Sequence, residues 1–122
     1  MTVTGPDFVA LQVRDVERAA QFYETHLGLK RTPAAPPGAV VFATSPIAFA
    51  VRETVPGVDL DAVTQPGAGV VLWLHSNDPE ELHRSLAESG TPILRGLEPS
   101  PFGLNFTFQD PDGYAVTVHG NR

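Results

Sequence analysis

Two histidines, His75 and His119, have side chains that could do acid–base or metal chemistry. Each stands at the end of an apolar run, where a histidine is more often solvated or hydrogen-bonded than a metal ligand. As alternatives, the pair could hold a metal ion, or His119 could act as a general base. The chain has no cysteine, and no serine, histidine and aspartate stand at a spacing that predicts a nucleophilic triad. Catalysis is therefore the weaker interpretation.

The composition is typical of one small acidic domain. With 122 residues, the chain is long enough to bury one good core. It has neither an apolar run long enough to span a membrane nor a basic-then-apolar leader, so we expect a cytoplasmic protein with no membrane partner. The net charge of -6 disfavours nucleic acid as a partner and favours neutral or cationic ligands.

The first half of the chain is predicted to form a strand, a helix and two further strands. An apolar run at 8–13 predicts the first strand, and apolar residues at helical spacing predict a helix from about 16 to 27. Asp15 can cap the start of this helix, and Gly28 can end it in the left-handed conformation. Short apolar runs predict the two further strands, near 39–43 and 47–52.

The second half repeats this order. An apolar run at 70–75 predicts a strand, and Asp78 and Pro79 open a helix that stops at Gly90. Glu81 is placed to reach back to the cap. Strand start and helix stop each lie 62 residues beyond their counterparts in the first half, which indicates an internal duplication. Coincidence between two ordinary strand–helix units is the alternative.

Three further apolar segments complete the second half, at 91–94, in FGLNFTFQ and in YAVTVH. Between the halves, the segment ETVPGVDLDAVTQPGAG contains two prolines, several glycines and little periodicity, which predicts a linker or a flap. We therefore expect a single domain over 1–122. Its predicted parts are a first module at about 5–54, a linker at about 55–67 and a second module at about 68–120.

Two stretches, VALQVRDVERAAQFYETHLGL and FTFQDPDGYAVTVHG, resemble the vicinal oxygen chelate superfamily. This superfamily contains glyoxalase I, extradiol dioxygenases, and fosfomycin- and bleomycin-resistance proteins. The FY pair at 22–23, the LGL helix stop at 27–29 and the DPDG turn at 110–113 recur at family spacing. The resemblance implies an α+β fold of two tandem βαβββ modules, whose curved mixed sheets form a cleft.

The resemblance also implies where a metal centre would stand. Family enzymes hold a divalent metal with His, Gln or Glu on the strand that opens each module, and with a Glu four residues after the glycine of the DPDG turn. In this chain these positions are Phe8, Val70 and Thr117. Such side chains do not supply the ligands that zinc, iron or manganese require. We therefore expect no metal, no other cofactor and no catalytic residue.

A cleft without metal ligands is expected to be an apolar concavity that binds a small molecule. Phe8 is then a wall of this pocket, with ordinary core packing as the alternative. Strand alternation places Ala10 and Gln12 on the same side as Phe8.

The same alternation, transferred by the offset of 62 residues, predicts the cleft-facing side chains of the second module: Val70, Leu72, Leu74, Asn105, Thr107, Thr117 and His119. Phe106 and Phe108 are expected in the core. Trp73 is expected to face its helix, with stacking on a ligand as the alternative. The remaining candidates, whose parity is open or which lie on a Pro-rich loop, are Phe42, Phe49, Arg52 and Phe102.

These features predict a metal-independent protein that sequesters a hydrophobic, planar aromatic natural product, in the manner of the antibiotic-binding resistance proteins of the superfamily. The alternatives are a glyoxalase-like lyase or dioxygenase-related enzyme with an unconventional site, and a regulatory subunit with a vestigial cleft. An apolar cleft would expose a large patch in a monomer. We therefore expect a two-fold homodimer, in which the first module of one subunit faces the second module of its partner.

Overall fold

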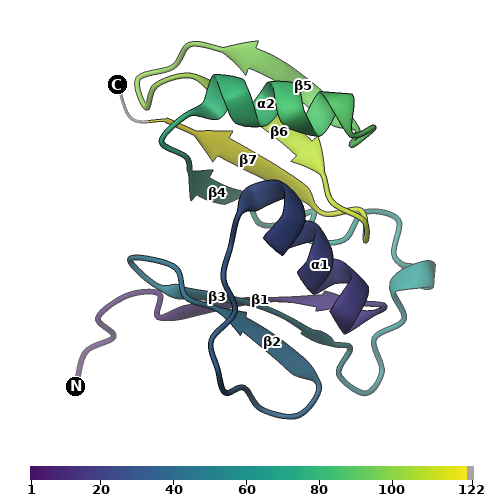
Figure 1. The fold of residues 1–122 in the computed structure, drawn as a ribbon. Helices are drawn as coiled ribbons and strands as arrows, with labels where there is room; N and C mark the ends of the chain where they lie inside the picture. Colours follow the sequence, from purple (N-terminus) through teal and green to yellow (C-terminus); the bar gives the residue numbers. More distant parts are fainter. Residues whose placement is uncertain (121–122) are drawn as a thin grey trace. The chain divides into compact units, whose positions relative to one another are not determined.

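The computed structural model describes residues 1–120, which divide into two compact units at the boundary between Leu60 and Asp61. This boundary lies inside the segment predicted to be a linker, where a 3-10 turn spans Leu60–Ala62. Unit 1 contains β1 (Phe8–Val13), α1 (Val16–Leu27), β2 (Ala39–Phe42) and β3 (Ala48–Glu53), as labelled in Figure 1. Unit 2 contains β4 (Leu72–His75), α2 (Pro79–Glu88), β5 (Ile93–Glu98), β6 (Asn105–Gln109) and β7 (Ala115–His119). Both units are α+β, and within residues 1–120 no helix is long and apolar enough to cross a membrane.

The sheet of unit 1 has the strand order β1-β3-β2, with β1 parallel and β2 antiparallel to β3. As predicted, α1 begins after the N-cap Asp15, whose carboxylate accepts a first-turn amide at 3.1 Å. It ends at Gly28, which adopts the left-handed conformation with φ 72°. The helix covers one face of the sheet, where the ring of Tyr23 packs against those of Phe42 and Phe49. These three buried rings form the centre of the unit 1 core.

Unit 1 has three strands where the predicted βαβββ pattern has four. The segment after α1 approaches β2, and the amide of Thr32 donates to the carbonyl of Val41 at 2.8 Å. Its strand-like pairing is limited to one isolated bridge, between Arg31 and Phe42. Three prolines follow within 33–37, and proline has no N–H to donate to a ladder. The missing strand is therefore reduced to a bridge.

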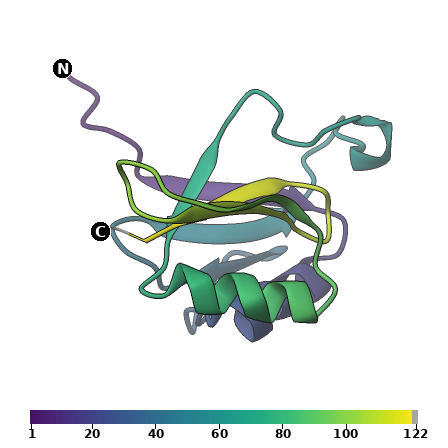
Figure 2. The same cartoon turned by 90° about the horizontal axis from the view of Figure 1, so that it is seen from above.

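The sheet of unit 2 has the order β4-β7-β6-β5, with β4 parallel to β7 and the other pairs antiparallel. As predicted, α2 begins after the N-cap Asp78, with Pro79 in its first turn. The carboxylate of Glu81 bonds to Arg84 within the helix. Figure 2 shows α2 along one face of this sheet. The fully buried side chains of the unit are Leu86 from the helix and Phe106, Phe108, Val116 and Val118 from the sheet, so the core prediction for the two phenylalanines is confirmed.

Candidate functional site

The face of the unit 1 sheet opposite α1 contains a pocket of about 150 Å³. Its lining residues are Phe8, Ala10, Pro36, Pro37, Gly38, Ala39, Val41, Ala50 and Arg52. The register explains this composition, because Ala10 pairs with Ala50 and Val41 also pairs with Ala50. Paired residues of neighbouring strands point to the same face, and two adjacent alanines leave a hollow there.

One side of the pocket is a turn formed by Pro36–Ala39. The amide of Ala39 donates to the carbonyl of Pro36 at 3.2 Å, and Gly38 has φ 77°. A proline followed by a glycine with positive φ is the pattern that type II turns favour. The turn thereby places two proline rings against the strands. Sequence reasoning missed these prolines, although the PPG string at 36–38 is a turn signal.

Phe8 lines this pocket and is 51% exposed, so its ring is a surface wall rather than part of the core. The predicted alternation is confirmed, because Ala10 and Gln12 follow Phe8 on one face of β1. Gln12 pairs with Arg52 in the register, and its side-chain oxygen accepts the amide of Val55 at 2.9 Å. Gln12 therefore also anchors the chain that leaves β3.

Arg52 is the cationic member of the pocket lining. Its Nε donates to the backbone carbonyl of Glu53 at 2.9 Å. Within residues 1–120, Arg52 forms no ion pair with a carboxylate. The pocket therefore combines apolar walls with one guanidinium whose terminal nitrogens have no partner in this part of the chain.

Phe42 and Phe49, whose parity the sequence leaves open, lie in the core rather than at the pocket. They are 0% and 4% exposed, and their rings stack with centroids 5.9 Å apart. Phe49 and Arg52 are three residues apart in β3, so alternation requires opposite faces for them. The sequence therefore contains enough information to exclude Phe49 once Arg52 is assigned to the pocket face.

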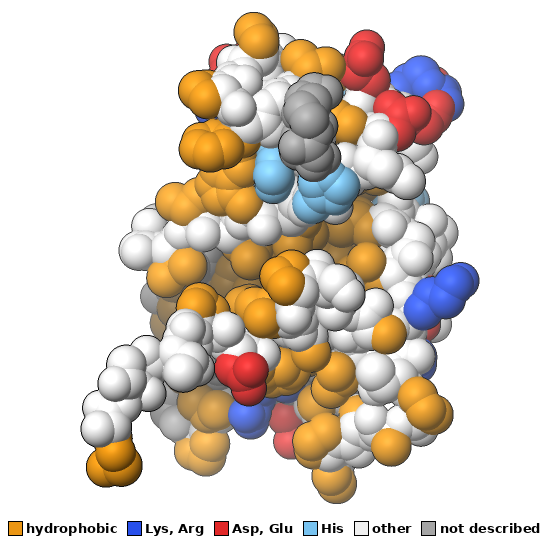
Figure 3. Space-filling model, turned by 90° about the vertical axis from the view of Figure 1, so that its left-hand side faces the viewer, with side chains coloured by type: hydrophobic (Ala, Val, Ile, Leu, Met, Phe, Trp, Pro, Cys, Tyr) orange, Lys and Arg blue, Asp and Glu red, His pale blue; other side chains and the backbone are white. Residues whose placement is uncertain are grey.

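The face of the unit 2 sheet opposite α2 carries a group of aromatic side chains, Trp73, His75, Phe102 and His119, which we call the aromatic platform. The ring of Trp73 meets that of Phe102 edge to face at 6.0 Å and that of His119 at 5.4 Å between centroids. His75 lies 5.7 Å from His119 by the same measure. Trp73 is 41% exposed and Phe102 is 62% exposed. In Figure 3, histidine side chains lie beside hydrophobic ones on the face in view.

The structure corrects the predicted side-chain directions in β4. Trp73 pairs with Thr117, and Leu72 pairs with the buried Val116. Leu72 and Leu74 therefore lie on the face covered by α2, whereas Trp73 lies on the open face. Val70 precedes the strand, which begins only at Leu72, and is 75% exposed.

An error of one residue in the repeat offset explains this correction. The N-cap residues Asp15 and Asp78 are 63 residues apart, not 62. A shift of one residue moves every side chain of a strand to the opposite face. The offset measured from the helix starts makes Trp73 the counterpart of Ala10 and His75 that of Gln12, which agrees with the observed faces. The caps were the better landmark because they fix the helix start that follows each strand.

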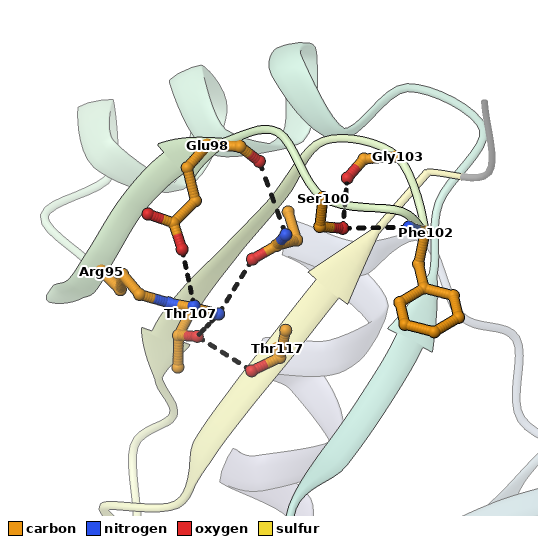
Figure 4. Close-up of polar contacts among 8 residues, drawn as sticks. Arg95, Glu98, Ser100, Phe102, Gly103, Thr107 and Thr117 are labelled. Carbon is orange, nitrogen blue, oxygen red and sulfur yellow. Dashed lines mark hydrogen bonds and ion pairs between the residues drawn. The ribbon is translucent and has the colours of Figure 1, made fainter.

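Phe102 projects from a compact loop between β5 and β6, shown in Figure 4. The Ser100 hydroxyl donates to the carbonyl of Gly103 at 2.7 Å and accepts the amide of Phe102 at 3.1 Å. His119 Nδ1 lies 3.2 Å from the carbonyl oxygen of Phe102. A carbonyl only accepts, so Nδ1 carries the proton in this bond, and a neutral His119 keeps its acceptor on Nε2.

A row of polar side chains crosses β5, β6 and β7 next to the platform (Figure 4). Arg95 donates to Glu98 at 2.7 Å, to Asn105 at 2.9 Å and to Thr107 at 3.3 Å. The hydroxyls of Thr107 and Thr117 are 2.8 Å apart. Asn105, Thr107 and Thr117 lie on the predicted face, but their polar atoms bond to each other and to Arg95.

Arg95 is a residue of this face that sequence reasoning missed. Alternation from the buried-side Ile93 would place Arg95 toward α2. The pairing of β5 with β6 shifts register on both sides of Arg95, and such irregularities redirect side chains. No pattern in the sequence announces this shift.

The residues at the family's metal positions do not fit a divalent metal centre. Phe8 has no donor atom in its side chain, and the corrected offset replaces Val70 by the equally apolar Val71. The Thr117 hydroxyl is bonded to Thr107. Within residues 1–120, no group of three or more His, Asp or Glu side chains could hold a metal ion, so the pair of His75 and His119 has no third ligand there.

Comparison with known proteins agrees with the fold and the family motifs. A family model for the Glyoxalase/Bleomycin resistance protein/Dioxygenase superfamily matches residues 5–118. Among solved structures, TnmS3, an antibiotic binding protein from Streptomyces sp. CB03234, has a TM-score of 0.75 at 21% identity, with 100% of this chain and 99% of that chain covered. A glyoxalase-related enzyme from Fulvimarina pelagi has a TM-score of 0.75 at 22% identity, with 98% and 89% covered.

A third solved structure, a lactoylglutathione lyase from Agrobacterium tumefaciens, has a TM-score of 0.69 at 17% identity, with 98% of this chain and 96% of that chain covered. These three likenesses show a shared fold and leave the activity open, because the fold alone does not fix a function. The family match spans nearly the whole chain, from residue 5 to residue 118. The chain belongs to the Glyoxalase/Bleomycin resistance protein/Dioxygenase superfamily.

Proposed function

We propose that this chain is a metal-independent binding protein that sequesters a hydrophobic, planar aromatic compound without converting it. The observation that carries the proposal is the aromatic platform. Trp73 and Phe102 keep much of their ring surface exposed on a sheet face, although large exposed aromatic groups are costly unless they serve an interaction. A flat aromatic ligand would bury this surface by stacking.

The family supports the same proposal. TnmS3, an antibiotic binding protein, has the fold of this chain, and the superfamily includes bleomycin resistance proteins. The apolar side chains at two of the family's metal positions favour binding over metal-assisted turnover. We therefore propose an antibiotic or a similar natural product as the ligand, and a cytoplasmic homodimer as the working form.

Tryptophan fluorescence tests this proposal directly, because Trp73 is the one tryptophan in the sequence. The full chain is titrated with a panel of planar aromatic antibiotics and flavins. We expect at least one compound to quench Trp73 saturably, to raise the melting temperature, and to be recovered with unchanged mass. A panel that neither quenches Trp73 nor shifts the melting temperature would contradict the proposal.

Two controls make the result specific. Phe102→Ala removes a ring of the platform and should weaken binding, whereas Val63→Ala removes an exposed apolar side chain of the segment before β4 and should not. Metal analysis of protein purified without chelators is the second control. Stoichiometric zinc, iron, nickel or manganese bound through β1, β4 or β7 would overturn a metal-independent site.

A second candidate function is acid–base catalysis by His119. The observation that favours it is the bond from Nδ1 to the Phe102 carbonyl, which leaves Nε2 as the acceptor of a neutral imidazole. In this case a bound compound is recovered chemically changed, and His119→Ala abolishes the change while the fold persists. Unchanged turnover in that variant would remove His119 as the base.

A further inference from the structure

We infer that the pocket of unit 1 binds an acidic group carried by an aromatic ligand, with the Arg52 guanidinium as its partner. The inference rests on the proposed function, because it names the chemical class of the ligand. It concerns a different surface from the aromatic platform, so it can be tested separately.

The first support is the availability of Arg52. Three other arginines already have carboxylate partners: Arg31 with Glu17 and Glu24, Arg84 with Glu81 and Glu88, and Arg95 with Glu98. Arg52 donates only through Nε, to a backbone carbonyl at 2.9 Å. Its two terminal nitrogens form the planar fork that matches a carboxylate or a similar oxyanion with two parallel hydrogen bonds. Within residues 1–120, no side chain occupies this fork.

The second support is the surroundings of Arg52. The pocket walls are the ring of Phe8, the prolines of the 36–38 turn and small aliphatic side chains. A flat ring can lie against Phe8, which is 51% exposed. Apolar walls exclude water from part of the contact, and a charged pair is stronger there than in open solvent.

The overall charge of -6 argues for a neutral or cationic ligand, so the two considerations must be weighed. Charges farther away than the Debye length, about 8 Å at physiological ionic strength, are largely screened. A bidentate contact to Arg52 acts at hydrogen-bond distance, about 3 Å, where screening is weak. Glu53 follows Arg52 in β3, so its side chain leaves the strand on the opposite face. The local cation should therefore outweigh the distant acidic surface.

Three naphthalene probes of one shape and different charge test this inference by calorimetry on the full chain. They are 2-naphthoate, 2-naphthamide and 2-naphthylmethylammonium. We expect 2-naphthoate to bind about tenfold more tightly than the amide, as one charge-assisted hydrogen-bonded pair allows, and the ammonium compound to bind most weakly. Amide signals of Ala10 and Ala50 in NMR spectra should shift with the acid, since both line the pocket.

Arg52→Gln should lower the affinity for 2-naphthoate to that for 2-naphthamide. Arg18→Gln is the matched control, because Arg18 is an exposed arginine of the same unit on α1 and makes the same change in net charge. It should leave the preference for the acid intact. Circular dichroism checks that both variants fold.

Several results would overturn the inference. These are equal affinity of the wild type for acid and amide, a preference for the ammonium compound, a preference for the acid that persists in folded Arg52→Gln, or no binding at the unit 1 pocket. None of them touches the proposed function, which fails only if Trp73 fluorescence and melting temperature stay unchanged across the panel of antibiotics and flavins.

Discussion

The open faces of the two sheets follow one construction and differ in what they present. In each unit the first and last strands are parallel neighbours, and a helix covers the other face. In unit 1, the central pair of the open face is Ala10 with Ala50. In unit 2, the equivalent pair is Trp73 with Thr117. The first pair opens a pocket, and the second supports the aromatic platform.

This difference shows that the fold selects the face, whereas side-chain volume decides the shape of the site on it. Two methyl groups leave room for about 150 Å³ of pocket next to Arg52. An indole in the equivalent position of β4 fills that space with a ring surface. Unit 1 thereby offers a hollow with a cation, and unit 2 offers flat rings beside hydrogen-bonded hydroxyls.

The largest expected effect separates the two faces of the unit 1 sheet. Phe49→Ala should lower the free energy of unfolding by about 3–5 kcal/mol, because Phe49 packs in the core against Tyr23. Phe8→Ala, on the open face, should cost under about 1 kcal/mol. Urea unfolding followed by circular dichroism measures both. Equal losses would show that the two faces are assigned incorrectly.

Removing the indole of unit 2 is expected to have the next largest effect. Trp73→Ala should weaken binding of the strongest quencher from the antibiotic and flavin panel at least about tenfold, as expected for a central aromatic contact. Calorimetry replaces fluorescence here, because the variant has no tryptophan. Stability should change little, since Trp73 is 41% exposed. Full affinity in the variant would locate the ligand elsewhere.

Filling the hollow of unit 1 should make its open face resemble that of unit 2. Ala10→Leu places a branched side chain in the pocket and should lower the affinity for 2-naphthoate by about tenfold, a typical cost of steric crowding. Ala34→Leu is the control, because it lies in the neighbouring Pro-rich segment and does not line the pocket. An unchanged affinity in Ala10→Leu would remove the pocket as a binding site.

The smallest expected effect concerns the helix sides of the two units. Arg31 bridges Glu17 at 2.7 Å and Glu24 at 2.8 Å, and the guanidinium lowers the pKa of both carboxyls. Carboxyls with a lowered folded pKa stabilise the fold above their ordinary pKa of about 4.3, and this contribution is lost as the pH falls through the folded value.

Arg31→Gln should therefore slightly lower the melting temperature at pH 7 and reduce its decline below about pH 4. Arg84→Gln removes a bridge that lies wholly within α2, whereas Arg31 joins the segment after α1 to that helix. Its effect should be smaller still. Melting curves from pH 2 to pH 7 compare the two variants, and identical curves for wild type and Arg31→Gln would contradict a role for this bridge.

Much of the fold is predictable from local signals in the sequence. The bounds of β1 and α1 follow from apolar periodicity, the Asp15 cap and Gly28, and the structure reproduces them. Asp78 and Pro79 likewise mark the start of α2. The absent fourth strand of unit 1 is explained by prolines that the sequence displays, although alignment with the family pattern predicts a strand there.

The candidate site is less predictable, because side-chain direction depends on register. A one-residue error in the repeat offset reversed the faces of β4 and misplaced Trp73. Arg95 depends on a register irregularity in β5 that has no sequence signal. By contrast, Phe8, Ala10 and Arg52 were correctly expected on one side, and the register confirms that Ala10 and Arg52 share the face of Phe8.

The account's central claim is that ligands bind to the open sheet faces and not to the helix sides. NMR titration of the isotope-labelled full chain tests it most directly, with 2-naphthoate for unit 1 and the strongest quencher of the panel for unit 2. We predict saturable amide shifts at Ala10 and Ala50 with the first compound and at Trp73 and Thr117 with the second, while α1 and α2 stay unshifted. Shifts confined to the helices, or no saturable shift with either compound, would contradict the account.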